Sequence, residues 1–478
     1  MGIVTPPDLQ DFMIVIRPQK NLYAKLEGKI ASEDESMMQE FFIWRNPLDF
    51  EDYYQLYAKG YMYVGVMHNV ADYLKHSGYN VVVDMGELSP PDFKAEFTRG
   101  YRPLQKRLVN AALEHRFGLL AAPPGSGKTD TLTKVIALLG KKAVVLTQAE
   151  EPFEGAYETI RDYSTCKVGR VGGGYHEPSD VTVCMVQTWN RRLTADEIDP
   201  ELIRVLQEAK VWITDEAHNC LTNSYFNMYE YAENVEYFLG TTATPFTSND
   251  RETLLYARVG PILEEIKYGE AIDNKILVPF TCYIEDAAPQ VFSKDKTKLA
   301  SYAKKKLWSK VKKEYIINNQ KRNKQYVDFA KESNSLGLSC AIIVSQVNHG
   351  KNMKKLYPDA VEVYGPTPKK RRKEIWAQLK TKEIKCVITT LMDEATDIPS
   401  LDCVALAAGG KSKVKLIQRL RNLRTFAGET VDGWFEKERG YVFITRDNAD
   451  YVKTHSDKNI GYLRELKREH HLNEIIKF

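Results

Sequence analysis

The chain lacks the features that would place it in a membrane or in an oxidising compartment. Its 478 residues hold no apolar run near the length of about 18 that a membrane helix needs, and the first ten, MGIVTPPDLQ, show no cleavable signal pattern. Its seven cysteines include no close pair of the kind that binds zinc. We therefore expect reduced thiols, no membrane partner and a cytoplasmic location.

Charge is unevenly divided along the chain. Residues 1–95 hold 8 Lys and Arg against 14 Asp and Glu, so this segment is −6, and the remainder, with 59 against 50, is +9. A modestly basic body is compatible with a polyanionic partner but does not establish one. The length is that of two to four domains, each able to bury its own core.

From about residue 101 onward, short apolar runs alternate with segments of helical length. The runs are FGLLAAP, KAVVLT, VTVCMVQT, VWITDEAH and VEYFLGTTATP, followed by CAIIVSQ, AVEVYG, KCVITTL and CVALAAG. This pattern predicts buried parallel strands in crossover units, hence an α/β fold with two lobes. We place the lobes at 96–250 and 251–478. Residues 1–95 are predicted to form a small α+β accessory module around one helix, MHNVADYLKHSG, with recognition of DNA junctions as a hypothesis for its role.

The most specific stretch is LLAAPPGSGKTDTLTKVIALLG, in which an apolar strand runs through glycines into a helix. It predicts a phosphate-binding loop, with Ala122 where the first glycine is usual. Glycines let backbone N–H groups face phosphates, Lys128 would reach the β and γ phosphates, and Thr129 would bind Mg²⁺. We expect ATP and Mg²⁺ as cofactors, held by Pro124, Gly125, Ser126, Gly127, Lys128, Thr129 and Asp130.

A second carboxylate for the metal is expected at the end of a neighbouring strand, and VWITDEAHN supplies it. Asp215 would hold Mg²⁺, Glu216 would take a proton from the attacking water, and His218 would relay to the other lobe. An Asp-Glu pair after a strand is by itself more often a helix cap. Its position in the same lobe as Lys128 makes it a catalytic candidate.

These motifs, in this order, resemble those of the DExH-type helicases and translocases of superfamily 2, over residues 100 to 447. The resemblance implies two tandem RecA-like lobes and ATP-driven movement on nucleic acid. YRPLQKRLV is similar to the adenine-side element, and TTATP to the coupling motif. The resemblance implies that Gln105 reads the adenine and that Arg102 is its neighbour in the nucleotide site. It also implies coupling for Thr242 and Thr244, nucleic-acid contact for Gln187, Thr188, Ser345 and Thr389, and nucleotide contact for Asp397.

The last motif of the family resembles QRLRNLR, which keeps Gln418, Arg421 and Arg424 but is one residue short and has no glycine. The resemblance implies that the two arginines face the γ-phosphate from the second lobe, so all three are catalytic candidates. A solvated basic helical face is the alternative, because arginines three apart lie on one side of any helix.

Within the superfamily the arrangement most resembles the UvsW-like recombination helicases of phages. This likeness implies a monomeric motor on branched or forked DNA that reverses forks and migrates junctions in recombination, repair or replication. It would work in the cytoplasm of a bacterial host if a phage encodes it. Two alternatives stay open: an RNA-directed helicase, since the motifs follow a phosphate backbone common to both polymers, and a nucleotide-switched clamp that does not unwind.

The lysine-rich segment from Lys294 to Lys313 has apolar residues at largely helical spacing. It predicts an amphipathic helix docked on the second lobe. Its lysines are either a solvated basic face or a surface that tracks phosphates.

Overall fold

The protein, seen here in a computed structural model, divides into two compact units, Met1–Ile266 and Lys267–Phe478. The structure describes residues 13–46, 49–102, 104–193, 199–243, 252–289, 308–391, 401–420, 423, 427–430, 433–470 and 475–477. All seven cysteines are free and buried. Among the helices in these ranges, none has both the length and the apolar content to cross a bilayer.

The N-terminal module is an α+β layer, as the sequence predicts. Its five-stranded sheet has the order β5-β6-β2-β1-β7, and β3 and β4 form a separate hairpin. The strands are β1 (Met13–Pro18), β2 (Tyr23–Glu27), β3 (Ile43–Asn46), β4 (Asp49–Gln55), β5 (Tyr57–Ala58), β6 (Tyr61–Tyr63) and β7 (Asn80–Val83). Two helices, α1 (Ser32–Phe41) and α2 (Met67–His76), accompany the sheet, where one was predicted.

The module packs directly on the lobe that follows it. A Cβ on Gly65, in the 3-10 turn after β6, would lie 1.9 Å from the backbone oxygen of Tyr256. The Arg258 guanidinium lies 3.7 Å from the Tyr63 ring and donates to the Tyr63 hydroxyl at 2.9 Å. The Phe226 ring lies 4.3 Å from the same guanidinium. Backbone and side chains therefore join the module to the first lobe.

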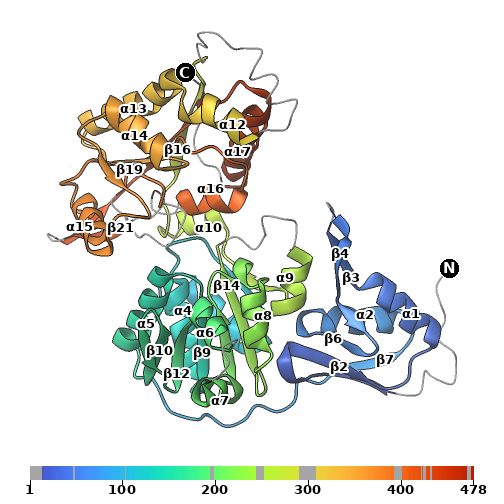
Figure 1. The fold of residues 1–478 in the computed structure, drawn as a ribbon. Coiled ribbons are helices and arrows are strands. Elements are labelled where there is room, and N and C mark those ends of the chain that lie inside the picture. The colour runs from blue at the N-terminus through green and yellow to red at the C-terminus, as the bar shows by residue number, and fades with distance from the viewer. Residues whose placement is uncertain are drawn as a thin grey trace. The chain divides into compact units, whose positions relative to one another are not determined.

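The first lobe is an eight-stranded sheet of order β11-β10-β12-β9-β13-β14-β8-β15, parallel except for the pairing of β10 with β11 (Figure 1). The five predicted strands of this lobe are confirmed, and their interior positions are fully buried because helices cover both faces. The strands are β8 (Phe117–Ala121), β9 (Ala143–Thr147), β10 (Val168–Gly172), β11 (Tyr175–Glu177), β12 (Val181–Met185), β13 (Val211–Thr214), β14 (Tyr237–Thr242) and β15 (Ile262–Glu265).

The helices of the first lobe alternate with these strands. They are α3 (Gln105–His115), α4 (Lys128–Leu139), α5 (Glu150–Tyr163), α6 (Val186–Leu193), α7 (Pro200–Glu208), α8 (Asn223–Tyr229) and α9 (Glu252–Val259). The lobe extends past the boundary predicted at residue 250, because β15 pairs in parallel with β8. The division between the units lies after Ile266.

The second unit has a seven-stranded parallel sheet of order β18-β19-β17-β20-β23-β16-β24. Its four predicted strands are confirmed. The strands are β16 (Phe280–Asp286), β17 (Cys340–Ile343), β18 (Val361–Val363), β19 (Cys386–Thr389), β20 (Cys403–Leu406), β23 (Gly440–Arg446) and β24 (Ile475–Lys477), with a hairpin of β21 (Ala427–Thr430) and β22 (Gly433–Glu436).

The helices of the second unit are α10 (Tyr268–Asp273), α12 (Trp308–Lys312), α13 (Gln320–Ser335), α14 (Val347–Leu356), α15 (Lys369–Lys380), α16 (Lys413–Arg419) and α17 (Asp450–His470). Of the predicted lysine-rich helix, the structure describes only the end. There α12 runs into a π-helical turn, Lys313–Ile317, whose Ile316 and Ile317 are buried. The remainder, up to residue 307, lies outside the described residues.

Candidate functional site

The glycine-rich loop, residues 122–127, joins the end of β8 to the start of α4. Gly125 and Gly127 have φ of 84° and 78°, in the left-handed region that other residues adopt at a cost. Gly127 caps α4, and a Cβ there would lie 2.2 Å from the Gln105 side-chain nitrogen. The turn therefore requires glycine and leaves a helix N-terminus open, which is the geometry that binds phosphate oxygens.

Lys128 is the first residue of α4, and its ammonium is folded over the glycine-rich loop. Its Nζ donates to the carbonyl oxygens of Ala122 at 3.1 Å and Pro123 at 3.5 Å. The Ser126 hydroxyl also donates to the Pro123 carbonyl, at 2.7 Å. Side chains of Lys128 and Ser126 therefore hold the loop through the loop's own carbonyl oxygens. Thr129, the predicted magnesium ligand, follows on α4 and is half-buried.

Gln105, predicted to contact the adenine, is fully buried and is hydrogen-bonded to the glycine-rich loop. Its Oε1 accepts from the Arg102 backbone N–H at 2.8 Å and from Lys134 Nζ at 2.9 Å, and its Nε2 donates to the Gly127 carbonyl at 3.1 Å. Contact with a base would therefore exchange one of these bonds. Arg102 lies at the loop's edge, with Nε 3.6 Å from Asp130 Oδ2.

Lys134 is a residue of this region that sequence reasoning missed. Its Nζ lies 3.9 Å from the Tyr101 ring and donates to the Gly100 carbonyl at 3.1 Å. Burial lowers the pKa of this lysine. The available signal was a lysine within the apolar run LTKVIALL.

The acidic pair follows β13, two strands away from the glycine-rich loop in the order β13-β14-β8. Carboxyl ends of parallel strands share one edge of a sheet, so this order brings the loop and the pair together. Asp215 Oδ1 accepts from Thr241 Oγ1 at 2.8 Å and from the Glu216 backbone N–H at 3.0 Å. Glu216 has a left-handed backbone, φ 50°.

The charges of this site act on one another. Burial, and then the negative charge of Glu216, raise the pKa of Asp215, whereas the Thr241 hydroxyl and the Lys128 ammonium lower it. Lys128 is therefore close enough to stabilise the ionised carboxyl. A divalent cation bound here would do the same, and the Asp215 carboxylate and the Thr129 hydroxyl are oxygen donors of the kind that Mg²⁺ prefers.

His218 and Thr242 link the acidic pair to the glycine-rich loop. His218 Nδ1 lies 3.3 Å from Thr242 Oγ1 and 3.4 Å from Glu216 Oε2. Burial lowers the pKa of His218, which favours the neutral imidazole. The Thr242 carbonyl accepts from the Ala122 backbone N–H at 3.0 Å, so one strand end contacts both motifs. Thr244 lies outside the described residues.

Thr241 is the second residue that sequence reasoning missed. The register of β13 with β14 pairs Thr214 with Gly240, so Asp215 faces Thr241 across the strands. Thr241 belongs to the motif TTATP, but the family resemblance implies the coupling role for Thr242 and Thr244.

The predicted nucleic-acid contacts of the first lobe lie at the same edge of the sheet. Gln187 and Thr188 are on the first turn of α6, directly after β12, where a continuing strand was predicted. Gln187 is exposed and Thr188 is half-buried. Both remain accessible to a ligand at this edge.

In the second unit, Ser345 follows β17 and Thr389 is the last residue of β19, and these two strands are parallel neighbours. The Ser345 backbone N–H donates to His349 Nδ1 at 3.4 Å, and Thr389 is fully buried, with its hydroxyl accepting from the Leu391 N–H at 2.9 Å. Gln418 is half-buried on α16. Asp397, Arg421 and Arg424 lie outside the described residues.

Comparison with known proteins matches residues 99–247 to the family described as type III restriction enzyme, res subunit. A putative helicase of Sulfolobus islandicus filamentous virus is 28% identical over 274 residues, which cover 55% of this chain and 47% of that protein. This chain therefore spans about half the length of that relative. The DNA 3'-5' translocase XPB2 of Sulfurisphaera tokodaii is 23% identical, over 73% of this chain and 82% of that one.

Two solved structures are also similar. T4 UvsW is 16% identical, with 98% of this chain and 99% of that chain covered and a TM-score of 0.43. S. cerevisiae Dbp5, bound to RNA and ADP BeF3, is 13% identical, with 79% and 89% covered and a TM-score of 0.51. The likeness to Dbp5 concerns the fold alone, and it agrees with the two RecA-like lobes predicted from the sequence.

Proposed function

We propose that this chain is a superfamily 2 helicase and that it works as an ATP-dependent DNA helicase or translocase that remodels branched DNA. Fork reversal and junction branch migration, in recombination, repair or replication, are the activities proposed. The observation that carries the proposal is a chain of contacts: the Thr242 carbonyl accepts from the Ala122 N–H at 3.0 Å, and His218 lies 3.3 Å from Thr242 and 3.4 Å from Glu216. We infer that the glycine-rich loop and the acidic pair form one site, which would bind a nucleoside triphosphate with its metal ion.

Each side chain of the site has a role in this proposal. Lys128 and the loop N–H groups bind the phosphates, and Thr129 with Asp215 would hold Mg²⁺, which neutralises phosphate charge when bound. Glu216 accepts the proton of the attacking water. Gln105 holds the loop in place through the Gly127 carbonyl.

Coupling between hydrolysis and movement is proposed for Thr242, because it contacts both the first residue of the loop and His218. When the nucleotide changes at the loop, this strand end transmits the displacement to the acidic pair. Gln418, Arg421, Arg424 and Asp397 keep the nucleotide-facing roles that the family resemblance implies. Gln187, Thr188 and Ser345 keep the implied contacts to the sugar-phosphate backbone. The same contact is proposed for Thr389, which is fully buried here and would have to become exposed to make it.

DNA is proposed as the polymer because the translocase relative is described as acting on DNA and is matched over most of its length. ATPase stimulation and strand separation, measured on single-stranded DNA, forks, four-way junctions and RNA at fixed salt, test this proposal. We expect forks and junctions to be remodelled only with ATP, and Lys128→Ala to abolish the reaction. Stronger stimulation by RNA than by any DNA would favour the RNA-directed alternative, and binding without strand separation would favour the clamp.

A further inference from the structure

A hollow lies in the second unit between the end of α12, the loop after β20 and the first turns of α17. It measures about 220 Å³, counted to its open mouth. The residues that line it are Lys312, Ile316, Gly409, Gly410, Asp447, Tyr451, Val452 and His455. None of the roles assigned above uses this hollow. It lies beside the carboxyl ends of β20 and β23, at the sheet edge that also carries Ser345 and Thr389.

The hollow is surrounded by positive charge. Burial lowers the pKa of Lys312, and Arg419, Lys415 and Arg322 lower it further as neighbouring cations. Within the described part of the chain, no carboxylate pairs with the Lys312 ammonium, which is half-buried. Unpaired charge that has lost part of its hydration favours an anion from outside the protein.

His455, which lines the hollow from α17, is subject to the same positive potential. Burial lowers its pKa first, followed by Lys411, Lys312 and Lys458. Among the residues that the structure describes, no acidic group contributes to the shift at this imidazole. Lys312 on α12 and His455 on α17 therefore both lie in the same region of positive charge.

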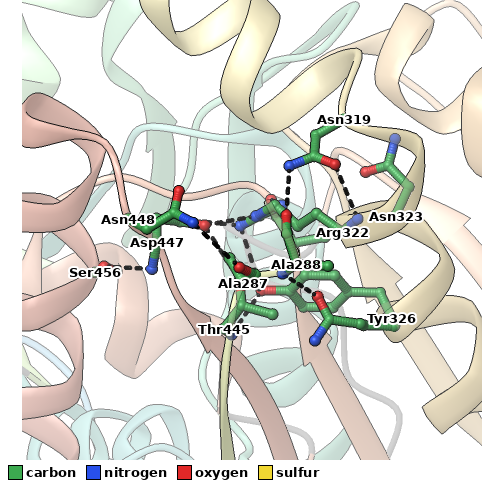
Figure 2. A network of polar contacts seen from close by, with 12 residues as sticks. Ala287, Ala288, Asn319, Arg322, Asn323, Tyr326, Thr445, Asp447, Asn448 and Ser456 are labelled. Carbon is green, nitrogen blue, oxygen red and sulfur yellow. Dashed lines mark hydrogen bonds and ion pairs between the residues drawn. The ribbon is translucent and has the colours of Figure 1, made fainter. Parts of the chain in front are cut away.

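The one carboxylate in the lining, Asp447, is paired with Arg322, so these two charges offset each other and the positive charge beside Lys312 comes from Arg419 and Lys415. Asp447 Oδ1 accepts from Arg322 Nε at 2.6 Å, and Oδ2 lies 3.4 Å from Arg322 Nη2. Thr445 Oγ1 donates to Oδ1 at 3.2 Å, and the Asp447 N–H donates to Ser456 Oγ at 3.0 Å. Figure 2 shows Asp447 directed toward Arg322 within this buried network.

The glycine pair provides close access to the backbone. Gly409 and Gly410 have φ of 66° and 113°, and a Cβ on either would meet no atom within 4 Å, so the space above them is open. Their carbonyl oxygens accept from Arg419 Nη1 at 3.4 Å and Asn459 Nδ2 at 2.9 Å. The loop's acceptors are thus engaged by protein donors, which reduces repulsion of an anion at the mouth.

We propose that this hollow binds a phosphate group of the polynucleotide, with Lys312 and Lys411 as its charged contacts. This inference rests on the proposed function, because it assigns one more backbone contact to the same DNA. The enclosed part of the hollow has room for about one water molecule, which is too little for a phosphate group. The phosphate would therefore bind at the open mouth of the hollow. A free nucleotide offers the same chemistry, and the experiment separates the two sources.

The test measures binding of a fluorescent single-stranded DNA oligonucleotide by anisotropy over a series of salt concentrations. Lys312→Gln is compared with wild type and with Lys324→Gln, an exposed lysine paired with Asp328 on α13. We expect Lys312→Gln to weaken binding and to reduce the slope of log K against log salt by about 0.7, the value for one contact to a single strand. Lys411→Gln, at an exposed position that folding tolerates, should act in the same direction.

An unchanged slope in both pocket variants, with normal salt-dependent binding by wild type, would overturn this inference and leave the proposed function intact. A loss of ATP affinity without DNA, together with an unchanged slope, would assign the hollow to a free nucleotide and also overturn it. Absence of DNA binding by wild type would instead refute the proposed function.

Discussion

Replacing Thr241 by valine isolates the hydrogen bond that keeps Asp215 ionised. The two side chains have nearly the same shape, but valine removes the hydroxyl that donates to Asp215 Oδ1 at 2.8 Å. Burial and the Glu216 charge raise the pKa of Asp215, and this hydroxyl opposes them. Without it the carboxyl holds its proton more tightly, so the substitution raises the pKa further.

A hydrogen bond to a charged group contributes about 1.5–3 kcal/mol, and one pH unit corresponds to about 1.36 kcal/mol. An ionised Asp215 is needed to hold the metal, so the acid limb of the ATPase pH profile should move upward by about one to two pH units. The rate at high pH, where the carboxyl is ionised in both proteins, should change least.

Thr133→Val is the matched control, because its hydroxyl donates at 2.9 Å to the Thr129 carbonyl within α4 and, among the described residues, to no carboxylate. Both variants should show the same urea unfolding profile as wild type. If the acid limbs of the Thr241 and Thr133 variants coincide with that of wild type, the hydrogen bond does not set the ionisation of Asp215, and the reasoning fails.

Three further predictions concern packing and the arginines. Gly65→Ala should separate the N-terminal module from the first lobe and increase its proteolysis, because the added Cβ meets backbone, whereas Gly155→Ala, with open space around it, should not. Arg322→Met should lower the free energy of unfolding in urea by about 3–5 kcal/mol, since it leaves a buried carboxylate without its partner, and a loss below about 1 kcal/mol would contradict that pairing. Arg421→Ala and Arg424→Ala should each abolish ATP turnover with ATP binding retained, and normal turnover in both would return them to a solvated basic face.

The sequence predicts the parallel sheets well, because strands buried on both faces form continuous apolar runs such as VWIT and CAII. It does not predict the position of β16. That strand pairs with β23 and with β24, which lie more than 150 residues away along the chain, and its own sequence, FTCYIED, ends in charged residues. Pairing over such a separation is decided by the packing of the whole lobe.

The site shows the same division between local and distant information. The glycine-rich loop and the acidic pair are local motifs, and the sequence predicts both. Thr241, rather than Thr242, reaches Asp215 because of the register of β14 against β13. A slip of one residue in that register would place Thr242 opposite Asp215 instead. The engagement of Gln105 by the loop and by Lys134 likewise depends on the packing of α3 against α4.

The central claim is that ATP turnover at the site of Lys128, Asp215 and Glu216 is coupled to DNA. The most direct test is ATP turnover with and without a forked DNA, for wild type and for Glu216→Gln, with binding of both ligands measured in parallel. The account predicts that DNA stimulates wild type and that Glu216→Gln binds ATP and DNA but does not turn over. DNA-stimulated turnover in Glu216→Gln, or no stimulation of wild type, would contradict it.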